Sequence, residues 1–147
     1  MIMENDFSII ISTCDKFSDL WDANILLLNQ NWADRNVETF LVTDRPTDRV
    51  FENVTVVAAG EETEITERLR SVLPMIKTEY VLFTLDDYFL TERISTQAIN
   101  EDIRIIEKYQ IDYLRLFVMT MRSLKNRKAK ELESGIFLLD NNAGDYI

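Results

Sequence analysis

The sequence predicts an α/β domain whose mainly parallel, doubly wound sheet carries helices on both faces. Short runs of β-branched and apolar residues alternate with segments whose apolar residues recur at helical spacing. An acidic residue directly follows several of these runs. The chain has 147 residues, of which 46% are hydrophobic and 29% charged, and this suits a single globular domain over residues 1–147.

Residues 7–13 form an apolar, β-branched run and predict the first strand. A helix is expected next, because Ser18 has the pattern of an N-cap and apolar residues recur as far as residues 29–31. Residues 38–44 repeat the strand pattern and precede a proline-containing turn. Residues 54–60 predict a third strand with glycine at its exit.

Helical spacing returns over residues 65–76, where Pro74 should end or kink the helix early. The apolar residues 81–85 suit a fourth strand that is buried on both faces. Ser95 is the expected cap of a helix with one isoleucine-rich face, and residues 113–119 predict a fifth strand. Strands that alternate with helices close by right-handed crossovers into a parallel sheet.

Composition excludes several kinds of site. Cys14 is the only cysteine, so an internal disulfide and a thiolate zinc cluster are ruled out. Histidine is absent, which rules out catalytic triads built on imidazole.

The apolar runs are too short to cross a bilayer and the first residues lack a signal-peptide pattern, so a cytoplasmic protein is expected. The net charge of -10 opposes binding to nucleic acid.

Acidic residues follow three predicted strands at their carboxyl ends: Asp15, Asp44, and the pair Asp86 and Asp87. Ligands of open α/β sheets bind beyond these ends. Two adjacent carboxylates repel each other, and a divalent cation bound to a phosphorylated ligand would compensate their charge. The sequence therefore predicts a magnesium or manganese site at Asp86 and Asp87. The alternative is that both acids are solvated turn residues.

Three segments resemble the nucleotide-binding half of a glycosyltransferase with the Rossmann-like GT-A fold, similar to family 2-like enzymes of bacterial surface polysaccharide synthesis. These segments are residues 7–15, 40–44 and 79–87, and the order of elements is similar over residues 7–119. The resemblance implies that a nucleoside diphosphate sugar binds with its base near Thr13, Cys14 and Asp15 and its ribose near Asp44. The sugar would pass to a polysaccharide, another saccharide or a lipid-linked acceptor.

The third segment resembles the strand that ends in the family's Asp-x-Asp metal motif. Aligned without a gap, the motif falls on residues 85–87, which makes Asp87 the better metal ligand. A slip of one residue places it on residues 86–88, with Asp86 first, and neither register gives a complete motif. The resemblance implies that Mn²⁺ or Mg²⁺ holds the diphosphate at these aspartates.

Family members take their catalytic base and acceptor site from a later segment. The chain ends at Ile147, so the GT-A domain is expected to be incomplete at its C-terminus and the catalytic residue stays unknown. Asp140 and Asp145 are the late acids near a predicted element, and neither is assigned as base. The alternative is a non-catalytic GT-A-like interaction protein or half of a split enzyme, which would form a homo-oligomer or heteromer through an uncovered sheet edge.

Two groups of basic residues remain. Arg70 and Arg68, which lie two residues apart, would reach a bound diphosphate, or would pair with glutamates on the same helix. Five basic residues also lie between Arg122 and Lys130. They are interpreted as a diphosphate clamp, as a peripheral contact with an anionic membrane or lipid-pyrophosphate acceptor, or as a solvated helix or loop, the commonest role of such runs.

Overall fold

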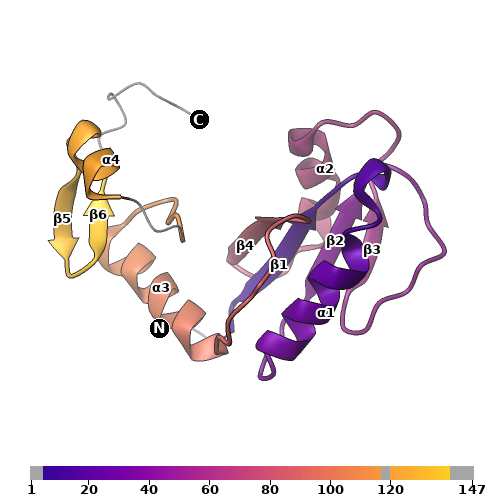
Figure 1. Ribbon diagram of the computed structural model, residues 1–147, viewed down its shortest axis with the longest axis horizontal. Coiled ribbons are helices and arrows are strands. Elements are labelled where there is room, and N and C mark those ends of the chain that lie inside the picture. The colour runs from indigo at the N-terminus through magenta and orange to yellow at the C-terminus, as the bar shows by residue number, and fades with distance from the viewer. Residues whose placement is uncertain (1–4, 117–119, 140–147) are drawn as a thin grey trace. The chain divides into compact units, whose positions relative to one another are not determined.

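The computed structural model describes residues 5–116 and 120–139 (Figure 1). Two compact units make up the chain, Met1–Asp112 and Tyr113–Ile147. No helix in the described ranges is both long and apolar enough to cross a membrane.

A four-stranded parallel sheet forms the centre of the first unit, in the order β3-β2-β1-β4. The central strand is β1, and Ile10 lies between Phe40 of β2 and Phe83 of β4. The parallel sheet with flanking helices confirms the predicted α/β class. The bounds of the strands are β1 (Phe7–Ser12), β2 (Thr39–Thr43), β3 (Thr55–Ala58) and β4 (Tyr80–Leu85).

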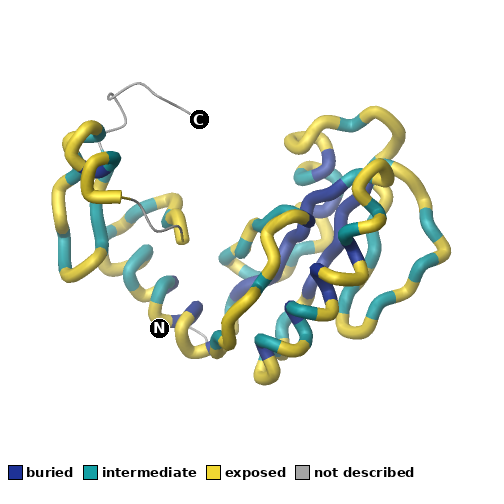
Figure 2. The backbone as a smooth tube through the Cα atoms, viewed as in Figure 1, coloured by how far each residue is buried: buried dark blue, intermediate teal, exposed yellow. Residues whose placement is uncertain are grey.

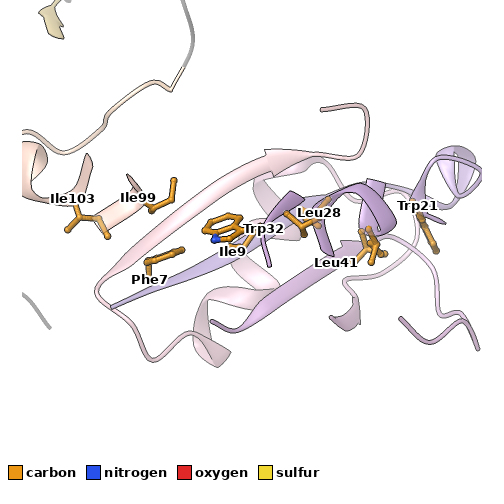
Figure 3. Close-up of a cluster of buried hydrophobic side chains, with 10 residues drawn as sticks. Phe7, Ile9, Trp21, Leu28, Trp32, Leu41, Ile99 and Ile103 are labelled. Carbon is orange, nitrogen blue, oxygen red and sulfur yellow. The ribbon is translucent and has the colours of Figure 1, made fainter. Parts of the chain in front are cut away.

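One face of the sheet is covered by α1 (Trp21–Asn31) and α3 (Thr96–Tyr109). Alternate residues of β1 point to this face and pack against helical side chains (Figure 3). Trp32 directly follows α1, stacks on Phe7 with ring centroids 6.0 Å apart, and donates its indole N–H to Thr96. The buried cluster comprises Phe7, Ile9, Ile11, Trp21, Ile25, Leu28, Trp32, Leu41, Ile99 and Ile103.

The opposite face is covered by α2 (Ile65–Val72), which packs chiefly on β1 and β2. Its buried cluster is smaller and consists of Ile10, Phe40, Val42 and Val72. As predicted, the helix ends before Pro74, and a short 3-10 helix spans Leu73–Met75.

The prediction that the fourth strand is buried on both faces is wrong. In β4 the exposure alternates, with Val81 39% and Phe83 43% exposed (Figure 2). The reason is positional: β4 is an edge strand of the described sheet, and α2 covers β1 and β2 instead. Only the side chains that face α1 and α3, Tyr80 and Leu82, pack against a buried cluster.

The predicted helix cap at Ser18 is also wrong. A 3-10 helix at Asp15–Phe17 comes first, and α1 begins at Trp21 with Leu20 at its N-cap position and no side-chain capping bond. The prediction at Ser95 is confirmed, since its side chain accepts a hydrogen bond from the main-chain N–H of Ala98 at 3.3 Å.

The C-terminal unit contains α4 (Met121–Asn126) and a hairpin of β5 (Lys130–Glu133) and β6 (Ile136–Leu138). Residues 113–116, the described part of the predicted fifth strand, are not a strand. The rest of that prediction, residues 117–119, lies outside the described residues. Residue types that favour strands were therefore not enough to make residues 113–116 pair with another strand.

Candidate functional site

The carboxyl ends of the four parallel strands meet at one edge of the sheet, here called the carboxyl rim and formed by residues 13–15, 44 and 86–87. The strand order places a topological switch point between β1 and β4, because the chain runs from β1 outward to β3 and then crosses to the other side. In open α/β sheets the crevice at such a point is where ligands bind. Two contacts organise the residues of this rim.

The first contact joins the ends of β1 and β4. Thr13 is buried, accepts a hydrogen bond from the indole N–H of Trp21 at 2.7 Å, and donates its hydroxyl to the Asp86 carboxylate. Asp86 is itself only 8% exposed. A buried carboxylate needs such a donor because desolvation penalises its charge. Thr13 and Asp86, predicted separately from two strand ends, are therefore direct neighbours.

The loop after β4 is held by a side chain of α1. The amide nitrogen Nδ2 of Asn24 donates to the main-chain oxygen of Asp86 at 2.9 Å and lies 3.3 Å from that of Tyr88. Asn24 is buried, so these bonds are shielded from water. The turn that carries Asp86 and Asp87 is thus fixed to the helix, while the Asp87 side chain stays exposed.

The second contact joins the ends of β1 and β2. The main-chain N–H of Asp15 donates to Asp44 Oδ1 at 2.6 Å, and the hydroxyl of Thr43 donates to the same oxygen at 3.2 Å. Partial burial acts to raise the pKa of Asp44, but these hydrogen bonds and the charge of Arg45 outweigh it and lower the pKa from its ordinary value. Asp44 is consequently an anion at neutral pH.

A buried cation lies beside the rim on the α2 face of the sheet. Arg68 is 9% exposed; its Nε donates to the Ser12 hydroxyl at 3.4 Å and its Nη1 to the carbonyl of Thr63. Among the described residues it forms no ion pair. An anion at the carboxyl rim would supply the missing counter-charge.

Arg70, the other arginine predicted to reach the diphosphate, is exposed. Two positions along a helix correspond to a turn of about 200°, so it points away from the side of Arg68. The signal for Arg68 was present in the sequence, because it lies four residues before the buried Val72 and hence on the same face of α2.

The two aspartates after β4 offer limited metal ligation by themselves. Within residues 5–116 and 120–139 no group of three or more Asp, Glu or Cys side chains is arranged to hold a metal. Asp86 is buried and its carboxylate accepts the hydroxyl of Thr13, so Asp87 is the exposed member of the pair.

The structure brings some predicted site residues together. Thr13 contacts Asp86, and Asp15 contacts Asp44, whereas Arg70 makes no contact with either pair. Cys14 is half-buried and free at the N-cap position of the 3-10 helix that follows β1. Asp140 and Asp145, the late acids, lie outside the described residues.

Comparison of the chain with protein-family models, with curated proteins and with solved structures gave no match. The resemblance to glycosyltransferases therefore rests on the three sequence segments that suggested it and stays a prediction.

Proposed function

We propose that this chain is a glycosyltransferase domain of the GT-A type that binds a nucleoside diphosphate sugar across the carboxyl rim and transfers the sugar to a saccharide or lipid-linked acceptor. The supporting observation is the contact of Thr13 with Asp86 at the switch point between β1 and β4. Ligands of open α/β sheets bind in this place.

Each part of the ligand has a suitable partner at the rim. The base lies near residues 13–15 in this proposal, and the ionised Asp44 accepts hydrogen bonds from the ribose hydroxyls. The positive charge for the diphosphate comes from Arg68, which lacks an acidic partner among the described residues. Arg70 is a second candidate, at the exposed surface of α2.

Asp87, with Asp86, would hold a Mn²⁺ or Mg²⁺ ion. When bound, the cation supplies charge neutralisation to the diphosphate. In the transfer, the bond between the sugar's anomeric carbon and the diphosphate oxygen breaks, its electron pair leaves with the nucleoside diphosphate, and the acceptor oxygen bonds to that carbon and loses its proton. The proton acceptor is not assigned to any described residue.

Titration calorimetry with uridine and guanosine diphosphates, with and without Mn²⁺, tests the proposal. We expect binding of one diphosphate that is strengthened by the metal. Asp44→Asn should weaken nucleoside and nucleoside diphosphate alike, by about tenfold, since a hydrogen bond to a charged group is lost. Arg68→Gln should weaken the diphosphate selectively.

Asp48→Asn is the matched control, because Asp48 is an exposed residue of the loop after β2. It changes the net charge as Asp44→Asn does and should leave binding unchanged. If folded protein binds neither diphosphate in the presence of Mn²⁺, the proposal is wrong.

A second function is favoured by the edge of the sheet. Val81 and Phe83 are exposed on β4, and residues 80–85 contain no charge or proline that would discourage pairing with another chain. The alternative is therefore a non-catalytic interaction protein that assembles through β4, as a homo-oligomer or with a second subunit. A stable monomer in sedimentation equilibrium would rule out the homo-oligomer, and Phe83→Lys should dissociate one if it forms.

A further inference from the structure

The C-terminal unit differs in charge from the rest of the chain. Of the 26 acidic residues, 22 lie in residues 1–112, whereas residues 113–147 contain six of the 16 basic residues and only four acids. The basic cluster comprises Arg122, Lys125, Arg127, Lys128 and Lys130. None of its members forms an ion pair with another described residue.

Four of these five cations lie in the last turn of α4 or within four residues after it. Lys128 has a φ of 49°, and its N–H donates to the carbonyl of Lys125 at 3.2 Å, while Ala129 N–H donates to the carbonyl of Leu124 at 3.0 Å. This pair of bonds is a Schellman motif, which reverses the chain directly after a helix. Lys130 consequently starts β5 only a few residues after the last turn of α4.

Exposed apolar side chains accompany the cations. Met121 is 75% exposed and lies four residues before Lys125, so the two share one face of α4. Leu138 is 47% exposed and pairs directly with Lys130 across the hairpin, so these two share one face of that hairpin. By contrast Leu124, on another side of α4, is buried.

We propose that the C-terminal unit docks on the surface of an anionic lipid bilayer. The cations would contact the phosphate groups, and Met121 and Leu138 would enter the boundary of the acyl chains, as apolar residues do in interfacial segments. A nucleic acid would also bind the cations through its phosphate groups, but it would leave Met121 and Leu138 exposed to water. The docking is independent of the glycosyltransferase proposal, because it involves no residue of the carboxyl rim.

Vesicle flotation of the full chain tests the docking. Vesicles of phosphatidylcholine alone are compared with vesicles containing about one-third phosphatidylglycerol. We expect binding only to the anionic vesicles, and a decrease with added salt because the surface charge is screened. The variant Lys125→Gln/Lys130→Gln should lower the partition coefficient about 25-fold, given about fivefold for each basic residue.

Lys77→Gln/Arg93→Gln is the matched control, since both residues are exposed in the first unit and the change in charge is the same. It should bind anionic vesicles within about twofold of the unchanged protein. Circular dichroism and thermal unfolding of each variant separate lost docking from lost folding.

Met121→Trp gives an independent readout that does not depend on removing charge. Its indole emission should shift to the blue on addition of anionic vesicles, while Trp21 and Trp32 are buried and should respond little. Equal binding to both kinds of vesicle, no binding to either, or no emission shift would overturn the proposal. So would binding to duplex DNA or RNA that matches or exceeds binding to anionic vesicles.

Discussion

The two faces of the sheet are packed to different degrees. On the face of α1 and α3, side chains of β1, β2 and β4 all pack against a large buried cluster. On the face of α2 the cluster is smaller, and β4 contributes the exposed Val81 and Phe83. Because successive residues of a strand point to opposite faces, β4 is half core and half surface. The difference indicates that the first face contributes more of the core than the second, on which β4 is surface.

Trp32→Ala should have the largest effect, because it removes a buried indole from the α1 face, where it stacks on Phe7 and bonds to Thr96. We expect a loss of about 3–5 kcal/mol in the free energy of unfolding, measured by urea denaturation. A loss below about 1 kcal/mol would contradict the assignment of this face as the main core.

Thr13→Val should rank second. It keeps the shape of the side chain but leaves the Trp21 N–H and the Asp86 carboxylate without their shared hydroxyl. We expect a loss of about 2–4 kcal/mol in urea denaturation, since unpaired buried polar groups cost about 1–3 kcal/mol each. Thr47→Val, at a half-buried threonine of the loop after β2, is the control and should cost much less.

Phe83→Ala should cost about 1 kcal/mol or less in the isolated chain, because Phe83, on the α2 face, is already 43% exposed. This result would sharpen the contrast between the two faces. A loss comparable to that of Trp32→Ala would show instead that Phe83 is covered in the folded protein, and sedimentation would then distinguish a second copy from intramolecular cover.

The smallest expected effect concerns pH. The pKa of Asp44 in the folded state lies below the ordinary value of 3.8, so this carboxylate stabilises the fold above that pH. The contribution is lost as the pH falls through the folded-state pKa. The difference in unfolding free energy between the unchanged protein and Asp44→Asn should therefore be constant between pH 5 and 7 and shrink below about pH 4. A difference that grows on acidification would contradict the lowered pKa.

Much of the sheet followed from the sequence because its strands are short, apolar and bounded by turn residues. The exposed side of β4 did not, since an apolar run predicts a strand but says nothing about its place in the sheet. Ser18 has the sequence pattern of a helix cap, but a 3-10 helix forms before it instead. The Asp44 carboxylate, which is distant in sequence, accepts the N–H of Asp15 at the start of that 3-10 helix. Contacts with residues distant in sequence therefore decide where such a helix begins.

The candidate site was predictable in part. Strand ends in a parallel sheet share one edge, so the neighbourhood of Asp15 and Asp44 followed from the fold class. The burial of Asp86 beneath Thr13 did not, because it depends on a contact between residues 73 positions apart. The sequence offered both Arg68 and Arg70 for the diphosphate, and the helical spacing of Arg68 to the buried Val72 distinguishes the two. Metal binding and sugar transfer remain predictions.

The side-chain amide of Asn24 has a thermodynamic consequence for any ligand that binds at the rim. The amide bonds the backbone on either side of Asp87 to α1, so the conformation of that turn is already fixed in the folded protein. A ligand arriving there would then lose little affinity to ordering the protein, and association would be fast for lack of a slow rearrangement.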